Sequence, residues 1–189
     1  DDVVKLLDQL GVPREAYDGI LTSGDATRAE MTRRGASAFH HIGPERDRTV
    51  WEGLPAREVQ LTSAEFILCT GLFDDERETP DDYAETLKTA HEAGLRMICA
   101  NPDIQVHRGS KLIWCAGALA AAYEKLGGEV LYFGKPHPPV YDAALKRLAE
   151  IRGAALDPTR ILAIGDGMRT DILGANRTGL DALFITAGI

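Results

Sequence analysis

Short apolar runs alternate with helical patterns along the last third of the chain, and this alternation restricts the fold more than any other feature. Strand patterns at 130–133, 160–164 and 182–185 are separated by helical patterns that begin at Pro138 and Thr170. Strands that alternate with helices at this spacing indicate βαβ units with parallel strands. The runs show little alternation of apolar and polar residues, as in strands buried on both faces. The sequence therefore predicts an α/β fold with a doubly wound parallel sheet.

The first two thirds of the chain contain two kinds of sequence. Residues 2–10 and 27–34 show helical patterns, and the run 18–22 between them predicts a short strand. From residue 36 the pattern changes, and we expect strands at 38–42, 57–61, 65–69 and 95–100 and helices at 80–93 and 111–126. We therefore expect a core built from residues 1–35 and 134–189, with residues 36–133 inserted as a separate α/β domain.

Charge and cysteine content argue against several classes of partner. The 189 residues carry a formal net charge of −8 and no cluster of lysines and arginines, which is unlike a nucleic-acid-binding protein. No apolar run approaches the length of a membrane span, so we expect no membrane partner. Cys69, Cys99 and Cys115 lie far apart and indicate buried, reduced thiols. We therefore expect a cytoplasmic location.

An acidic loop follows the apolar run that ends near Ile164. Asp166 lies between Gly165 and Gly167 at the predicted end of the strand, and Asp171 lies five residues further on, where a helix begins. Ligands of doubly wound sheets bind beyond the carboxyl ends of the strands. Two carboxylates in one tight loop suit Mg²⁺, which takes oxygen ligands. Taken alone, the loop is explained equally well without a metal. In that alternative Asp166 is a turn residue, and Asp171 is an acidic residue at a helix start, where the helix dipole favours it.

A lysine follows the preceding strand at the matching position. Lys135 stands between Gly134 and Pro136, directly after the run 130–133. The crossover between the two strands is expected to bring Lys135 and Asp166 to the same edge of one sheet. A lysine beside carboxylates neutralises them and can hold a phosphate as a point charge. The alternative, a solvated surface lysine, loses weight because the acidic loop is expected beside it.

These motifs together resemble the haloacid dehalogenase (HAD) superfamily of hydrolases. Gly134-Lys135-Pro136, Gly165-Asp166 and Arg169-Thr170-Asp171-Ile172 match the pattern of its last two motifs. The segment Ile98-Cys99-Ala100-Asn101-Pro102-Asp103, followed by a helix rich in small residues, is similar to subfamily IIA, the NagD-like sugar phosphatases. The resemblance implies a HAD-like Rossmannoid core, here incomplete at the N-terminus, with an inserted α/β cap domain of the C2 type.

The resemblance also implies a mechanism for hydrolysing phosphoric monoesters. An aspartate attacks phosphorus to form an aspartyl-phosphate, with Mg²⁺ bridging nucleophile and phosphate. Carried over residue by residue, Asp166 binds the magnesium ion, Asp171 supports the metal site, and Lys135 neutralises nucleophile and phosphate. Asn101 and Asp103 would help to select the substrate. Arg169 would contact either the phosphate or the loop acid.

The nucleophile motif of the family, Asp-x-Asp after the first strand, has no counterpart in this sequence. Asp1-Asp2 reads as the start of a helix, and Thr22-Ser23-Gly24 as a turn, not as the Ser/Thr motif of the family. We therefore expect a chain that is incomplete at its N-terminus and inactive without upstream residues. The missing unit would be one strand, helix and strand, about 30 residues or more.

Two functions follow from these observations. The first is a magnesium-dependent phosphatase of small phosphorylated metabolites such as sugar or nucleotide phosphates. The alternative is a non-catalytic module that binds a phosphometabolite or mediates oligomerisation. The small residues of the stretch Ala116 to Ala122 would form either a packing face or the contact of a homodimer.

Overall fold

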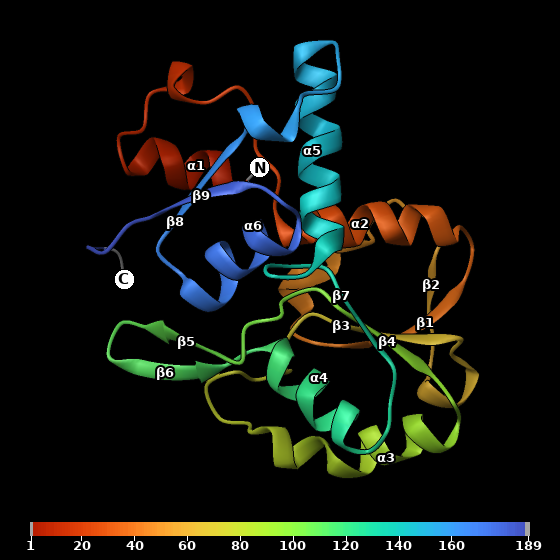
Figure 1. The fold of residues 1–189 in the computed structure, drawn as a ribbon. Helices are drawn as coiled ribbons and strands as arrows, with labels where there is room; N and C mark the ends of the chain where they lie inside the picture. The colour runs from red at the N-terminus through yellow and green to blue at the C-terminus, as the bar shows by residue number, and fades with distance from the viewer. Residues whose placement is uncertain (1, 188–189) are drawn as a thin grey trace.

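The computed structural model describes residues 2–187 and has a five-stranded parallel sheet at its centre (Figure 1). The order across the sheet is β2-β1-β3-β4-β7. The strands are β1 (Ala38–Ile42), β2 (Arg57–Glu58), β3 (Phe66–Cys69), β4 (Arg96–Cys99) and β7 (Val130–Tyr132). The predicted α/β fold with a parallel sheet is therefore confirmed.

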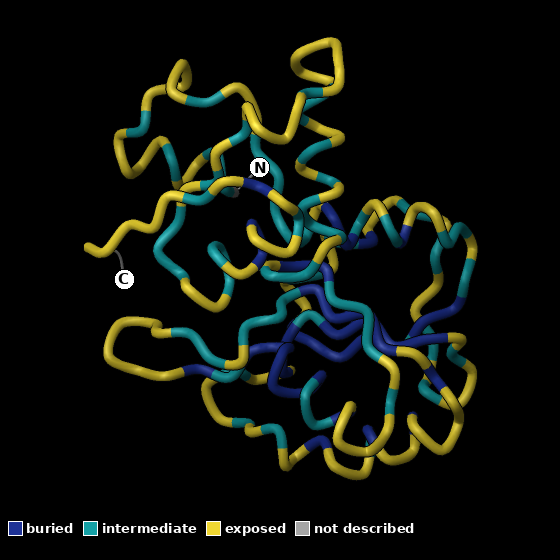
Figure 2. Tube along the Cα trace, in the orientation of Figure 1, coloured by how far each residue is buried: buried dark blue, intermediate teal, exposed yellow. Residues whose placement is uncertain are grey.

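Both faces of this sheet are covered, which explains why its central strand, β3, is apolar without alternation. On β3, Ile67 lies in a cluster with Leu87 and Leu119, whereas Phe66 lies in a second cluster with Met31 on the opposite face. Successive strand residues point to opposite faces, so a strand buried on both sides needs apolar residues throughout. Figure 2 shows these strands as the buried interior of the molecule.

Helices form the layers on either side of the five-stranded sheet. On one face lie α3 (Ala84–Glu92), which follows the 3₁₀ turn Pro80–Tyr83, and α4 (Ala116–Lys125). On the other face, α2 (Ser23–Arg34) and α5 (Pro138–Arg152) contribute side chains to the second cluster. The small residues of α4 are mostly buried within this chain, which favours the packing-face interpretation over a dimer contact for them.

The remaining strands form two small sheets. The strands β8 (Leu162–Gly165) and β9 (Asp181–Phe184) pair in parallel, apart from the central sheet, with α6 (Leu173–Arg177) between them in sequence. The prediction that these strands are buried on both faces is wrong: the Ile164 side chain, for example, is 63% exposed. The physical reason is that, within residues 2–187, no layer covers that face of the pair. The helix α1 (Asp2–Gln9) forms as predicted.

Two local predictions fail because they depended on partners that a sequence does not show. Residues 18–22 form no strand, since no neighbouring strand within residues 2–187 pairs with them. Residues 111–114 are not helical. They are the strand β6 (Lys111–Trp114), which pairs antiparallel with β5 (Gln105–Arg108) across a turn where Gly109 has a φ of +64°.

The division into a core (1–35 and 134–189) and an inserted domain (36–133) stays a prediction. All strands of the central sheet lie between residues 38 and 132. However, α2, which the prediction assigned to the core, packs on this sheet through Ala26 and Met31. Among residues 2–187, no helix combines enough length with enough apolar character to cross a bilayer. The three cysteines are free and buried, as predicted.

Gly117 lets α4 approach the loop after β4, and this generates a prediction. A Cβ atom at this position would lie 2.1 Å from the carbonyl oxygen of Pro102. We expect Gly117→Ala to lower the free energy of unfolding by about 1–3 kcal/mol, because the added methyl group forces the loop and the helix apart. Urea denaturation measures this difference.

The matched control is Gly24→Ala in the first turn of α2. There the added Cβ would meet its nearest neighbour at 3.4 Å, an ordinary contact. Alanine is the better helix former, so the control variant should be unchanged or slightly more stable. Equal stabilities of the two variants would contradict the close approach at Gly117.

Candidate active site

Residues from four separate segments line one cavity of about 490 Å³. Lys135 follows β7, Asp166 follows β8, and Asp171 lies where the polypeptide turns into α6. Asn101 and Asp103, which follow β4, line the same cavity. The structure therefore brings together five of the six residues named from the sequence. The sixth, Arg169, is exposed and is not among the residues that line this cavity.

The expectation that Lys135 and Asp166 share one sheet edge is wrong. The strand β7 belongs to the central sheet and β8 belongs to the small sheet with β9. The two loops meet through side chains and not through neighbouring strands. The Nζ atom of Lys135 donates a hydrogen bond to Oδ1 of Asp171 at 2.5 Å. The same two groups form an ion pair in the wall of the cavity.

Asp171 is held at both carboxylate oxygens. Oδ1 faces Lys135, and Oδ2 accepts a hydrogen bond from the backbone N–H of Gly167 at 3.0 Å. Burial alone would raise the pKa of the Asp171 carboxyl, but the hydrogen bonds from Lys135 and from the loop backbone outweigh it and lower the pKa. The ionised carboxylate therefore fixes the acidic loop against the lysine.

The two glycines of the acidic loop are required by this tight geometry. A Cβ atom on Gly165 would lie 2.3 Å from Cγ of Asp171, and one on Gly167 would lie 2.0 Å from Oγ1 of Thr170. From α5, the hydroxyl group of Tyr141 donates to the carbonyl oxygen of Asp171 at 3.2 Å. The loop is thus folded over the Asp171 side chain and fastened to α5.

The loop after β4 also lies close to the lysine segment, which we define as Gly134 and Lys135. A Cβ atom on Gly134 would lie 2.3 Å from Cδ of Pro102, so only glycine allows the two segments to touch. Within the loop, Oδ1 of Asn101 accepts a hydrogen bond from the backbone N–H of Asp103 at 3.2 Å, an Asx turn. Asn101 and Asp103 therefore border the cavity beside Lys135 in a loop with a fixed shape.

The hydroxyl-bearing residues Thr22, Ser23 and Tyr141 were not identified from the sequence as part of this cavity. Thr22 and Ser23 line it, although the sequence indicated only a turn, and Thr22 forms a capping box with Asp25 at the start of α2. Their recognisable signal is a Thr-Ser pair directly before a helix. Tyr141 also lines the cavity, and its position in the first turns of the helix that follows Lys135 was the available signal.

The residues that the structure describes offer a magnesium ion few protein ligands. Within residues 2–187 there is no group of three or more histidine, cysteine, aspartate or glutamate side chains placed to hold a metal. Both oxygens of Asp171 have hydrogen-bond partners, which suits a supporting position better than direct coordination. Asp166 lines the cavity, and Mg²⁺ commonly takes one or two carboxylates and completes its shell with water and phosphate oxygens. The arrangement fits magnesium on those terms.

Comparison with known proteins finds relatives among hydrolases and phosphatases. The HAD-hydrolase-like family matches residues 132–189. The ribonucleotide monophosphatase NagD of Escherichia coli (strain K12) is 36% identical over 97 residues, which cover 51% of this chain and 35% of that protein. A dihydroxyacetone phosphatase of Corynebacterium glutamicum (strain R) is 34% identical over 97 residues, which cover 51% of this chain and 33% of that protein. The matches thus span about a third of these curated relatives.

A solved structure matches over most of the chain. It is a hydrolase of the haloacid dehalogenase-like family from Brucella suis 1330, with 50% sequence identity and a TM-score of 0.86. The match covers 94% of this chain and 68% of that chain.

The lowered pKa of Asp171 generates a prediction. Replacing Lys135 by methionine removes the hydrogen bond and the positive charge, so the pKa of the Asp171 carboxyl should rise. A group with a lowered pKa stabilises the fold above its unfolded-state pKa, about 3.9 for aspartate, and loses that contribution as pH falls through the folded-state value. The stability difference between wild type and Lys135→Met should therefore be present at neutral pH and shrink in acid.

Carbon-13 NMR titration of the Asp171 carboxyl carbon measures its pKa. Urea denaturation at several pH values, from about 7 down to about 3, measures how the free energy of unfolding of each protein changes with pH. Because Lys135 is 54% exposed, the difference at neutral pH should stay below about 1 kcal/mol. Lys146→Met, a change of an exposed lysine on α5, is the control. An unchanged pKa of Asp171 in Lys135→Met would contradict the ion pair.

Proposed function

The chain belongs to the haloacid dehalogenase-like family of hydrolases, and we propose that it forms the metal- and phosphate-binding part of a magnesium-dependent phosphatase of small phosphorylated metabolites. The observation that carries this proposal is the shared cavity of Lys135, Asp166 and Asp171, with the Lys135–Asp171 ion pair in its wall. A fixed cation beside a carboxylate is an arrangement that binds a phosphate dianion together with a metal ion.

Each residue has a distinct proposed task. The ammonium group of Lys135 attracts the phosphate oxygens and offsets the negative charge that builds up as the phosphoryl group transfers. Asp171 keeps that ammonium group in place and, through the N–H of Gly167, keeps the shape of the acidic loop. Asp166, which lines the cavity, is the proposed magnesium ligand. A bound magnesium ion would supply charge neutralisation for the phosphate oxygens.

The attacking group is proposed to be an aspartate outside these 189 residues. Asp171 makes an ion pair, and Asp166 is assigned to the metal, so neither is proposed to attack phosphorus. Phosphoryl transfer to such an aspartate would give an aspartyl-phosphate that water hydrolyses. Two relatives are named for ribonucleotide monophosphate and dihydroxyacetone phosphate, which supports phosphoric monoesters of nucleotides or sugars as substrates.

A binding module without catalysis is the second candidate. It would use the same cavity without phosphoryl transfer. Such a module would still hold a phosphate through Lys135. The cytoplasmic location and a homodimer stay predictions for either candidate.

The proposal predicts a large loss of activity when Asp166 is replaced by asparagine in the full-length protein. Hydrolysis of p-nitrophenyl phosphate with and without magnesium measures it. We expect kcat/KM to fall by about a hundredfold or more, because the neutral amide is a poor magnesium ligand. The isolated 189-residue chain should show no magnesium-dependent turnover, because the nucleophile is proposed to lie outside it.

Asp142→Asn is the matched control, because Asp142 is an exposed aspartate on α5, and its activity should equal that of the wild type. Strong magnesium-dependent turnover by the 189-residue chain would show that the nucleophile lies within it. An inactive full-length protein would instead favour the binding module. Equal magnesium binding by the wild type and by Asp166→Asn would give further support to the binding module.

A further inference from the structure

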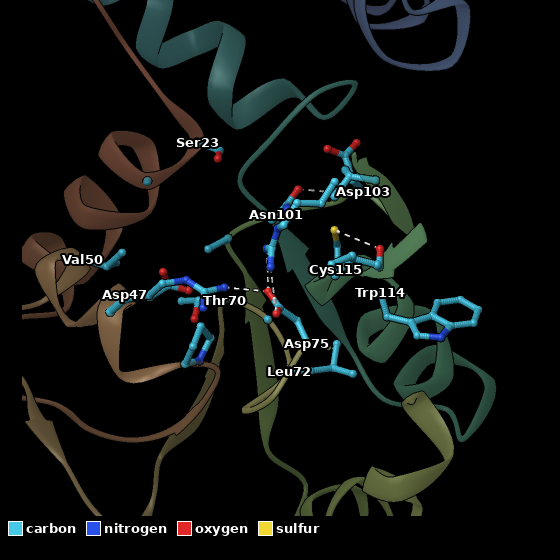
Figure 3. A pocket seen from close by; sticks show the side chains of 18 residues that line it. Ser23, Asp47, Val50, Thr70, Leu72, Asp75, Asn101, Asp103, Trp114 and Cys115 are labelled. Carbon is cyan, nitrogen blue, oxygen red and sulfur yellow. Dashed lines mark hydrogen bonds and ion pairs between the residues drawn. The ribbon is translucent and has the colours of Figure 1, made fainter. Parts of the chain in front are cut away.

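A second cavity of about 490 Å³ adjoins the candidate active site (Figure 3). Ser23, Asn101 and Asp103 line both cavities, so the two are neighbours with a shared wall. We propose that this second cavity binds the leaving group of the phosphoric monoester and selects a neutral, polyhydroxylated group, such as a sugar or a polyol, over one that carries a second anionic group. This inference rests on the proposed phosphatase function.

The shared wall determines where the two parts of a substrate would lie, the phosphate in the first cavity and the leaving group in the second. A phosphate beside Lys135 lies on the first cavity's side of the loop that holds Asn101 and Asp103. The carbon chain of the ester can then pass along this loop into the second cavity. Cavities of a few hundred Å³ accommodate small metabolites, and the volume here is in that range.

The charged groups of the second cavity are largely paired with one another. Oδ2 of Asp75 accepts hydrogen bonds from Arg46 at 2.7 Å and from Arg108 at 2.8 Å, and Oδ1 accepts a second one from Arg108 at 3.1 Å. The Asp75 side chain is only 13% exposed beneath these guanidinium groups. The hydrogen bonds from Arg108, with those from Arg46, lower the pKa of the Asp75 carboxyl, so it is ionised at neutral pH.

Asp75 also ties together three distant segments of the chain. Arg46 lies in the 3₁₀ helix Glu45–Val50, Asp75 in the loop that follows β3, and Arg108 at the end of β5. Figure 3 shows the hydrogen bonds converging on Asp75, with Asp47 and Thr70 to its left and Asn101 above it. The wall is thus held in place before a ligand binds, which reduces the entropy cost of binding.

The two guanidinium groups of this cavity share the carboxylate of Asp75, and two further aspartates line it. Its lining includes two arginines and three aspartates, namely Arg46, Arg108, Asp47, Asp75 and Asp103. An additional carboxylate or phosphate would face this surplus of aspartates and would be repelled.

Hydroxyl groups suit the same lining. A hydroxyl can donate to a carboxylate and accept from a guanidinium N–H, so adjacent acid and base groups satisfy both of its functions. The hydroxyl of Thr70 and the amide of Asn101 add further partners. A neutral polyol therefore matches the cavity better than a sugar acid does.

The test compares glycerol phosphate with phosphoglycolate, whose leaving group carries a carboxylate, on the full-length protein with magnesium. Each kcat/KM is divided by that for p-nitrophenyl phosphate, which reports the phosphoryl step. The wild type should prefer glycerol phosphate by at least about tenfold. Asp75→Asn should shift the preference toward phosphoglycolate by roughly fivefold, because it leaves two guanidinium groups without their carboxylate.

Glu76→Gln is the matched control, since Glu76 neighbours Asp75 in sequence, does not line the cavity and pairs with Lys111. It should leave the preference unchanged. If Asp75→Asn fails to fold, Arg46→Gln decides the question, because the loss of a cation should shift the preference roughly fivefold away from phosphoglycolate.

A wild-type preference for phosphoglycolate would overturn the inference and leave the proposed phosphatase function intact. The same conclusion would follow if the cavity variants shifted the preference no more than Glu76→Gln. Absence of hydrolysis of all three esters, p-nitrophenyl phosphate included, would overturn both.

Discussion

The ion pair between Lys135 and Asp171 connects two parts of the molecule that no backbone ladder joins. Lys135 follows a strand of the central sheet, whereas Asp171 belongs to the segment after β8, which lies in a separate sheet. The side-chain contact, together with the hydrogen bond from Tyr141 on α5, fixes the position of the cation relative to the acidic loop. Charge pairing of partly exposed groups is weak as a source of stability, so its main effect here is one of position.

Close approaches of backbone complete the same arrangement. Gly134 allows the lysine segment to touch Pro102, and Gly117 allows α4 to pack against the carbonyl of the same proline. The loop that carries Asn101 and Asp103 is thereby held between the lysine segment and α4. Because this loop borders both cavities, its position sets where a phosphate can lie and where the rest of a substrate can extend.

The sequence predicts those features that depend on local pattern and burial. Residues 38–42 are predicted as a strand and form β1 with the same bounds, because the strand is largely buried and pairs with β2 and β3. Lys135 and Asp166 were found because each follows an apolar run directly. The expected strand at 18–22 and the helix expected from residue 111 failed, because strand formation depends on a partner elsewhere in the chain.

The contributions of Thr22, Ser23 and Tyr141 to the cavity could not be predicted either, since tertiary packing brings them there. Arg169 shows the converse case. Its place in the sequence motif suggests a contact with the phosphate or with the loop acid, yet the turn in which it lies leaves it exposed outside the cavity lining. Motif membership therefore located the loop correctly but did not determine which of its side chains face the cavity.

The most direct test of the account is a crystal structure of the full-length protein with magnesium and vanadate, an analogue of the transferring phosphoryl group. The account predicts vanadate in the cavity beside Nζ of Lys135, with magnesium bound to the carboxylate of Asp166 and the Lys135–Asp171 ion pair retained. Vanadate bound elsewhere, or a Lys135 amine more than roughly 8 Å from the Asp166 carboxylate and so unable to share one phosphate site with it, would contradict the assignment of this cavity as the active site.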